Sequence, residues 1–325
     1  MKRTSTCVLL CGLLAASAGA DQPLERVHHR QIHMGMQVAI TVYAPDRLTG
    51  DEACRAAFAR IAALDAMMSD YRPDSELNRL CAQAGGPPVP VSPELLTVLQ
   101  RALLISERSG GAFDVTVGPY VRLWREWRKT GQEPSEAEWR AAGELVGWQQ
   151  VRLDPAARTV QLLLPGMELD LGGIAKGYAL DEALAVLRAR GLPRALVAAG
   201  GDIAVGDPPP GREGWRVEVA YAEPGRRRLL VSNVGVSTSG DTEQFVEVDG
   251  RRCSHIIDPR SGPRFGEPLV ATIVAPDATT SDGLATAAVV LGQERALALV
   301  ASFSGVTAYV RVADQPALEP VSPQP

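Results

Sequence analysis

The spacing of apolar positions predicts helices mainly in the first half of the chain and strands mainly in the second. Apolar side chains recur at helical spacing in residues 51–68, whereas residues 31–43 alternate between apolar and polar as a half-buried strand does. The predicted helices cover residues 51–68, 93–110, 135–147, 174–190 and 281–303. The predicted strands cover residues 31–43, 150–154, 159–171, 195–199, 215–221, 229–236, 244–248, 269–275 and 307–312.

Capping residues mark several of these boundaries. Ser92 followed by Pro93 predicts the start of a helix, because serine accepts from the first-turn N–H groups and proline suits the first helical position. Ser135 with Glu138 three residues later has the spacing of a capping box. Gly191 suits the position just after the 174–190 helix.

A hairpin signal indicates that part of the sheet is antiparallel. Val248 and Arg251 flank Asp249-Gly250, a dipeptide typical of a type I′ turn. Since helices and strands are both numerous, the predicted fold class is α+β, or mixed α/β. About 305 residues remain after an N-terminal leader, which suits one two-lobed domain or two subdomains within residues 21–314. The proline-rich residues 315–325 are predicted to form a flexible tail.

The first 20 residues have the order of a secretory signal peptide. Lys2 and Arg3 precede an apolar stretch that ends in small residues at 18–20, and this order predicts cleavage before Asp21. No later stretch offers about 18 uninterrupted apolar residues. We therefore expect an exported protein, periplasmic or secreted, that is not an integral membrane protein.

Composition argues against several classes of function. Loss of Lys2 and Arg3 takes the formal net charge from −5 to −7, and a mildly acidic protein gives no sign of a nucleic-acid surface. The remaining cysteines are Cys54, Cys81 and Cys253, too few and too scattered for a disulfide framework or a zinc site. One bridge between Cys54 and Cys81 stays open.

Residues 170–178 place a carboxylate, a glycine turn and a lysine between a predicted strand and a predicted helix. Glycines at such a turn let backbone N–H groups approach an anion such as a phosphate. Lys176 is followed by Gly177 rather than by Ser or Thr, so a Walker A loop does not match, and the sequence also lacks a G-x-G-x-x-G fingerprint. On these residues alone, a phosphate site and a plain glycine turn are equally supported.

Three further residues carry candidate chemistry, and each also has a structural interpretation. Asp282 and Thr286 are four residues apart on one helical face, where both oxygens can reach a hard cation such as Mg²⁺. Asp282 equally suits a helix N-terminus, and Thr286 can bond back to a carbonyl; spacing alone favours this interpretation. His255 follows a predicted strand, where an imidazole can accept a proton from a hydroxyl or serve packing alone.

Short motifs follow one another along most of the chain after the leader. They lie at residues 33–36, 68–71, 75–78, 112–114, 170–178, 237–240, 255–262 and 282–286. Their content and order resemble the FAD:protein FMN transferase family, also called the ApbE family. Met36, where the family often has threonine, and Cys253, near an often aromatic position, depart from the pattern.

The resemblance implies a two-lobed fold with partly antiparallel sheets and a flavin cleft. It implies Mg²⁺ ligands at the carbonyl oxygen of Gly173 and the side chains of Asp282 and Thr286, and it makes His255 the candidate catalytic base. The positions implied to contact FAD are Met34, Tyr71, Ala112, Phe113, Asp114, Asp170, Lys176 and Ile256.

The implied reaction is the Mg²⁺-dependent cleavage of FAD, with transfer of FMN to a threonine or serine hydroxyl of an acceptor protein and release of AMP. The acceptors would be exported flavoproteins, often membrane redox subunits. Two other activities stay open. One is a FAD pyrophosphatase, a hydrolase in which water replaces the acceptor hydroxyl, and the other is a non-catalytic flavin-binding protein.

Overall fold

The computed structural model describes residues 23–219, 228–240, 245–248, 251–263 and 269–312. Its largest element is a seven-stranded sheet in the order β1-β2-β6-β7-β10-β13-β14, and every neighbouring pair in it is antiparallel. The strands are β1 (Glu25–His33), β2 (Met36–Ala44), β6 (Ala195–Ala199), β7 (Asp202–Val205), β10 (Val234–Gly240), β13 (Leu269–Ala275) and β14 (Thr307–Val312).

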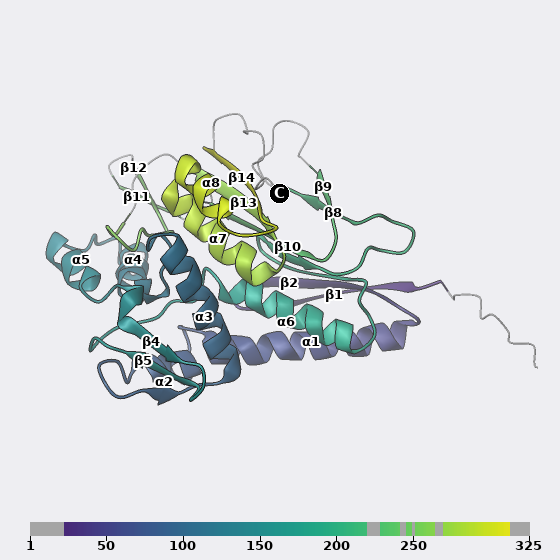
Figure 1. The fold of residues 1–325 in the computed structure, drawn as a ribbon, viewed down its shortest axis with the longest axis horizontal. Helices are drawn as coiled ribbons and strands as arrows, with labels where there is room; N and C mark the ends of the chain where they lie inside the picture. The colour runs from purple at the N-terminus through teal and green to yellow at the C-terminus, as the bar shows by residue number, and fades with distance from the viewer. Residues whose placement is uncertain (1–22, 220–227, 241–244, 249–250, 264–268, 313–325) are drawn as a thin grey trace, which may run out of the picture.

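Helices pack along this sheet in the order of its strands (Figure 1). Helix α1 (Arg47–Met68) contacts β1 and β2, and α6 (Ala175–Ala189) contacts β6 and β7. Helix α7 (Ala278–Leu291) contacts β10 and β13, and α8 (Gln293–Ala301) contacts β14. The main hydrophobic core fills this interface, and α6 additionally contacts both α1 and α7.

The other elements lie outside this sheet: α2 to α5 and the strands β3 to β5 gather toward one end of the molecule, and β8 with β9 lies toward the other (Figure 1). Three short strands form a sheet in the order β3-β5-β4. Two further pairs, β8 with β9 and β11 with β12, are antiparallel. The elements are α2 (Glu76–Cys81), β3 (Val89–Pro90), α3 (Pro93–Arg108), η1 (Val115–Val117), α4 (Gly118–Thr130), α5 (Glu136–Gly143), η2 (Trp148–Gln150), β4 (Val151–Asp154), β5 (Thr159–Leu162), β8 (Trp215–Glu218), β9 (Arg228–Val231), β11 (Phe245–Val248) and β12 (Arg251–Ser254).

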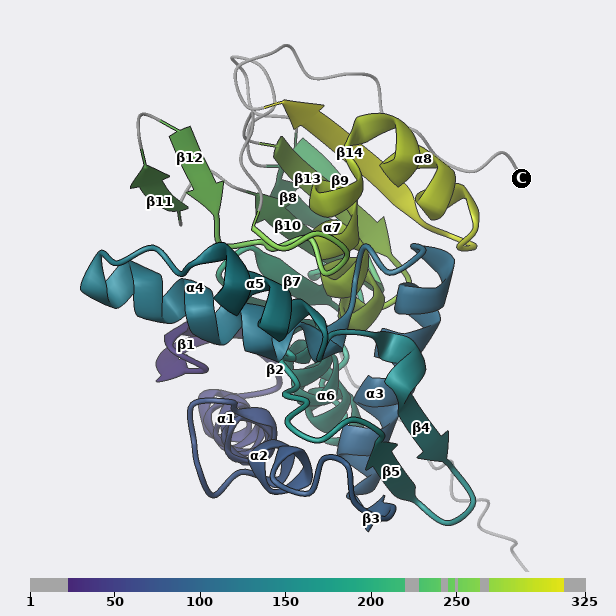
Figure 2. The same cartoon turned by 90° about the vertical axis from the view of Figure 1, so that its left-hand side faces the viewer.

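A smaller hydrophobic cluster joins α4, α5, β12 and the segment that follows β12. In Figure 2 the β11–β12 pair lies directly above α4 and α5. The buried members are Tyr120, Trp124, Trp127, Ala142, Cys253 and Ile257. The described residues therefore form one large core under the sheet and a smaller core rich in aromatic residues. Small satellite cores of this kind often lie under long connecting segments.

Several predicted elements are confirmed. The mixed α+β class is correct, with antiparallel pairing throughout the described strands. Ser92 caps α3 by accepting from Leu95 N at 3.1 Å, and Ser135 with Glu138 forms the expected capping box of α5, which ends at Gly143 rather than at 147. Gly191 follows α6 with a φ of +77°.

Other predicted elements are wrong because turns interrupt a continuous apolar pattern. The predicted strand 31–43 is the hairpin of β1 and β2, turned at Met34 and Gly35 with φ of +51° and +72°. The predicted helix 281–303 is two helices, since Gly292 at φ +77° separates α7 from α8. The predicted strand 229–236 is likewise two, β9 and β10, divided near Asn233 at φ +54°.

The remaining differences are local. The predicted strand 159–171 stops at Leu162, three residues before Pro165, and the chain reaches α6 without further strand structure. Strands β3 and β7 were not predicted, and β12 was implied only by the predicted hairpin. The β11–β12 pairing confirms the hairpin, while its turn residues, the signal peptide, residues 315–325 and the predicted strand ends at 221 and 244 lie outside the described residues.

Two findings bear on localisation and redox chemistry. Cys54 and Cys81 are both free, so the bridge left open by the sequence is not formed. Within the described ranges, no helix combines the length and the apolar character needed to cross a membrane.

Candidate functional site

The candidate site begins at the turn that leads into α6. Asp170 Oδ1 accepts from Gly172 N at 2.7 Å, and Leu171 O accepts from Ile174 N and Ala175 N at 3.0 and 2.8 Å. A Cβ placed on Gly173 would lie 3.0 Å from Thr286 Oγ1 and 3.2 Å from the Phe113 ring. Glycine at this position therefore lets the turn lie directly against α7.

One lysine and two aspartates form a buried ion cluster where α6 crosses α7. Lys176 Nζ pairs with Asp202 of β7 and lies 3.1 Å from Asp282 Oδ1 of α7. Gly177 N donates to the other oxygen, Asp282 Oδ2, at 3.0 Å. The Asp282 and Asp202 side chains are 1% and 3% exposed, against 24% for Lys176. The predicted phosphate lysine thus contacts two carboxylates.

Burial dominates the electrostatics of this buried ion cluster. Removal from water, together with the nearby Asp202 carboxylate, raises the pKa of Asp282 to about 7, although Lys176 and Gly177 N oppose the shift. Burial also lowers the pKa of Lys176, but the two carboxylates outweigh it and hold the pKa above its ordinary value. Lys176 is consequently a permanent cation at neutral pH.

The predicted magnesium ligands come together around the same helix crossing. Thr286 lies one turn after Asp282 on α7, its Oγ1 3.4 Å from Ser239 Oγ of β10, and Gly173 packs against it. Within the described ranges there is no group of three or more His, Cys, Asp or Glu side chains that suits a metal. A set of one carboxylate, one hydroxyl and one carbonyl oxygen still fits a hard cation such as Mg²⁺, which prefers oxygen ligands. The ligand assignment itself stays a prediction.

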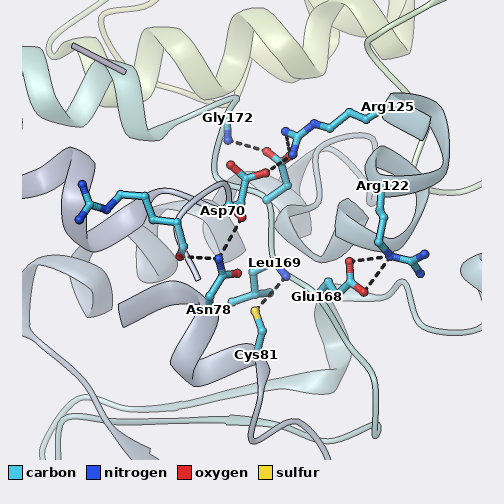
Figure 3. A network of polar contacts seen from close by, with 10 residues as sticks. Asp70, Asn78, Cys81, Arg122, Arg125, Glu168, Leu169 and Gly172 are labelled. Atoms are coloured by element: carbon cyan, nitrogen blue, oxygen red, sulfur yellow. Dashed lines mark hydrogen bonds and ion pairs between the residues drawn. The ribbon is translucent and has the colours of Figure 1, made fainter. Parts of the chain in front are cut away.

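A second ion cluster, at the surface, contains two predicted flavin contacts. Arg125 of α4 pairs with Asp70 and donates from Nη2 to Asp170 Oδ2 at 3.0 Å (Figure 3). Its Cζ lies 4.3 Å from the centroid of the Tyr71 ring. Arg125 and Asp70 were not predicted as site residues, because ion-pair partners from different elements leave no mark in the spacing of either.

The 112–114 segment is buried and tightly bonded. Asp114 Oδ1 accepts from Thr116 N and Thr116 Oγ1 at 2.8 and 2.7 Å, and Asp114 Oδ2 accepts from Trp148 N at 2.7 Å. Burial raises the pKa of Asp114, and these hydrogen bonds oppose the rise. Asp114 therefore caps the turn that begins η1. Phe113, by contrast, packs beside Gly173, next to the predicted cation ligands.

The other predicted residues are more dispersed along the site. Met34 sits in the β1–β2 turn and its N–H donates to Asp65 Oδ2 at 3.1 Å. Ile256 is buried, with its N–H on Ser254 Oγ at 2.9 Å. His255, half-buried, lies against Trp124 of α4, with ring centroids 6.3 Å apart. These contacts with FAD, and the role of His255, stay predictions.

A cavity of about 250 Å³ opens elsewhere on α6, between α3, β10 and the start of α7. None of the predicted site residues lines it. Its wall includes Asp181, whose carboxylate accepts from Ala278 N and Thr279 N at 2.8 Å each and so caps α7. Asp181 is thus a structural link between α6 and the helix that carries Asp282.

Comparisons with known proteins give one consistent answer. The model of a family described as the ApbE family matches residues 34–310. A FAD:protein FMN transferase of Treponema pallidum is 35% identical over 319 residues, covering 92% of this chain and 88% of that protein. A solved flavin transferase ApbE from Vibrio cholerae has a TM-score of 0.80 at 27% identity, covering 92% and 97% of the two chains. The apo flavinyl transferase ApbE of Pseudomonas stutzeri has a TM-score of 0.81 at 28% identity, covering 92% and 95%.

Proposed function

This chain belongs to the ApbE family, and we propose that it is a Mg²⁺-dependent FAD:protein FMN transferase. The observation that carries the proposal is the helix crossing of α6 and α7, where Gly173, Thr286, Asp282 and Lys176 meet. Oxygen donors for a cation and the permanent positive charge of Lys176 lie together there, and both suit the cleavage of a pyrophosphate.

The proposed reaction joins FMN to a protein hydroxyl. The oxygen of a threonine or serine side chain forms a bond to the phosphorus on the FMN side of the pyrophosphate. The bond from that phosphorus to the bridging oxygen breaks, and AMP leaves with this oxygen. The hydroxyl proton passes to a base, so the product is a phosphoester between FMN and the acceptor protein. A bound Mg²⁺ would neutralise the negative charge that develops on the phosphates.

Residues of the chain supply position and charge for this step. Asp282 and Thr286 would hold the cation with the Gly173 carbonyl, while Lys176 and Gly177 N fix the Asp282 carboxylate. We assign the acceptance of the hydroxyl proton to His255, whose ring is oriented by its contact with Trp124. The proposed FAD contacts remain those implied by the family motifs.

The proposed acceptors and location follow from the leader sequence. The order of Lys2, Arg3 and the apolar stretch after them is typical of an export signal. We therefore propose that the protein acts in the periplasm or outside the cell. Its protein substrates would then be exported flavoproteins, including membrane redox subunits. N-terminal sequencing of protein recovered from the periplasm tests this, and a chain that starts at Met1 would contradict it.

The test uses FAD, Mg²⁺ and several acceptor proteins, followed by intact-mass analysis and measurement of AMP. Acceptor adducts of FMN mass with stoichiometric AMP support transfer. Free FMN and AMP without adducts on any acceptor would instead establish the pyrophosphatase, and FAD binding without cleavage would leave a flavin-binding protein.

Two variants locate the chemistry. Asp282→Ala should lose Mg²⁺-dependent turnover by at least about 100-fold while still binding FAD, since it removes the only carboxylate among the proposed cation ligands. Asp277→Asn is the matched control, because Asp277 caps the same helix through Thr280 N at 2.7 Å and an asparagine can keep that bond. Wild-type turnover of Asp282→Ala at limiting Mg²⁺ would refute the cation assignment.

The second variant tests the base. Loss of adducts and AMP in His255→Ala would support the role of His255 as base.

A further inference from the structure

Tyr71 has an unusual position for an aromatic side chain. Among the large hydrophobic side chains of the described residues it is the most exposed, at 75%. The backbone on both sides of it is nevertheless fixed, because Asn78 Nδ2 donates to the carbonyl oxygens of Asp70 and Arg72 at 2.9 and 2.8 Å (Figure 3). Only the torsion angles of the ring itself remain free.

Arg125 restrains those torsion angles. Its guanidinium lies over one face of the Tyr71 ring, 4.3 Å from the centroid, which is within the range of a cation–π interaction. The guanidinium cannot drift along the ring, because ion pairs to Asp70 and Asp170 hold it from the sides. The ring is therefore held from one face, and its exposure leaves the other face accessible to solvent.

The same guanidinium keeps two carboxylates together. Burial raises the pKa of Asp170 most, the neighbouring Asp70 carboxylate adds to the rise, and Arg125 opposes both. Without Arg125, the two like charges would repel each other and Asp170 would tend to take up a proton. With it, Asp170 remains a hydrogen-bond acceptor held on the turn that leads to Gly173.

We propose that Arg125 is a positioning residue of the FAD site. It holds the Tyr71 ring for stacking on a planar heterocycle of FAD and holds the Asp170 carboxylate to accept a hydrogen bond from an N–H of that heterocycle. The inference rests on the proposed function, which names FAD as the ligand and Tyr71 and Asp170 among its contacts. A planar, forked guanidinium suits this task, because it bridges two carboxylates and stacks on a ring at once, which an ammonium cannot do.

The test measures FAD affinity, by quenching of flavin fluorescence without Mg²⁺ or acceptor. We expect the Kd of Arg125→Met to rise about tenfold and that of Arg125→Lys, which keeps the charge but not the fork, about threefold. Arg122→Met is the matched control, since Arg122 lies on the same helix but pairs outward with Glu168 at 3.0 Å (Figure 3). Its Kd should equal that of the wild type.

A double-mutant comparison separates positioning from a general loss of structure. If Arg125 acts through the Tyr71 ring, the Kd of the Arg125→Met/Tyr71→Leu double variant should rise by less than the product of the two single effects. Full multiplication of the two effects, an unchanged Kd in Arg125→Met, or an equal rise in Arg122→Met would each overturn the proposal. If Arg125→Met does not fold, Arg125→Lys carries the same comparison.

Separate titrations with FMN and ADP identify the heterocycle. A weakened affinity of Arg125→Met for either half of FAD supports the proposal, and loss for neither half contradicts it. Failure of this inference is distinguishable from failure of the proposed function. Binding assays do not depend on transfer. If the Arg125→Met variant binds FAD with wild-type affinity and still modifies acceptors, only the inference is refuted.

Discussion

Two ion clusters of the same composition lie in the proposed site, and they differ in how much water reaches them. Lys176 joins Asp202 and Asp282 where α6 crosses α7, with both carboxylates nearly inaccessible. Arg125 joins Asp70 and Asp170 between α4 and two loops, with side chains that are 35%, 21% and 10% exposed. Each cluster has one positive and two negative charges.

The difference indicates what each cation does. In the buried cluster the lysine compensates charges that water cannot reach, so its removal affects the stability of the fold. In the surface cluster water can replace much of the arginine's charge, so its removal affects the orientation of Tyr71 and Asp170 more than the fold. The cation of the buried cluster therefore contributes mainly to stability, and the cation of the surface cluster mainly to the orientation of two proposed ligand contacts.

The largest expected effect on the free energy of unfolding comes from replacing the cationic side chain of each cluster, Lys176 or Arg125, in turn. Lys176→Met leaves two buried carboxylates uncompensated and should lower the free energy of unfolding by about 3–5 kcal/mol. Arg125→Met should lower it by less, about 1–2 kcal/mol, because Arg125 and Asp70 are partly solvated and only Asp170 is nearly buried. Urea unfolding at pH 8 measures both. Equal losses in the two variants would contradict the distinction between the clusters.

The geometry of the buried cluster depends on a close approach of two helices. A Cβ on Gly177 would overlap the carbonyl oxygen of Ala278, so Gly177→Ala must push α6 away from α7. We expect a loss of about 3 kcal/mol in unfolding free energy, although alanine normally favours a helix over glycine.

A second helical glycine provides the control for this substitution. A Cβ on Gly283 of α7 would meet only the end of the flexible Ile105 side chain, 2.5 Å away, which can rotate aside. Gly283→Ala should therefore cost less than about 1 kcal/mol. If both alanine variants are equally stable, the close contact between α6 and α7 at Gly177 does not determine the stability of the helix crossing.

The sequence predicted the framework of the fold better than its breaks. Helices and strands with strong periodicity, such as α1, α3, β13 and β14, are where the pattern places them. Breaks at Met34-Gly35, Asn233 and Gly292, all at positive φ, were missed, because apolar residues on both sides keep the period of one continuous element. Apolar periodicity runs through such turns and conceals them.

The site was predictable only where a residue type and its neighbours in sequence carry the signal. Asp282 and Thr286 share a helix face, so their spacing could be recognised, and Lys176 belongs to a glycine turn. Asp202 and Arg125 acquire their meaning from ion-pair partners elsewhere in the sequence, Lys176 and Asp70. Tertiary contacts of this kind require the fold.

A third carboxylate, that of Asp181, tests whether a buried carboxylate needs a neighbouring cation in order to stay ionised. Asp181 caps α7 through N–H donors and the Thr279 hydroxyl, and burial raises its pKa to about 6, with a further contribution from Asp277. Since the folded pKa exceeds the unfolded value, the contribution of Asp181 to stability is full below about pH 4 and is lost as the pH rises through 6. The asparagine of the Asp181→Asn variant neither gains nor loses a proton in this pH range.

The stability of the wild type relative to Asp181→Asn should accordingly fall by about 2 kcal/mol between pH 4 and pH 7. Thermal or urea unfolding of both proteins across this range measures the difference. A relative stability that rises with pH would mean that the N–H donors hold the carboxylate ionised, and that hydrogen bonds alone replace the cation present in the other two clusters.

The smallest expected effect belongs to an ion pair outside both clusters. Arg122 and Glu168 lie 3.0 Å apart but their side chains are 59% and 39% exposed. Arg122→Met should change the unfolding free energy by about 0.5 kcal/mol or less, and added salt should remove that difference, because exposed charges are screened. A loss close to that of Arg125→Met, persisting in high salt, would show that exposure does not separate the pairs of α4. The distinction between Arg125 and Arg122 would then rest on FAD affinity alone.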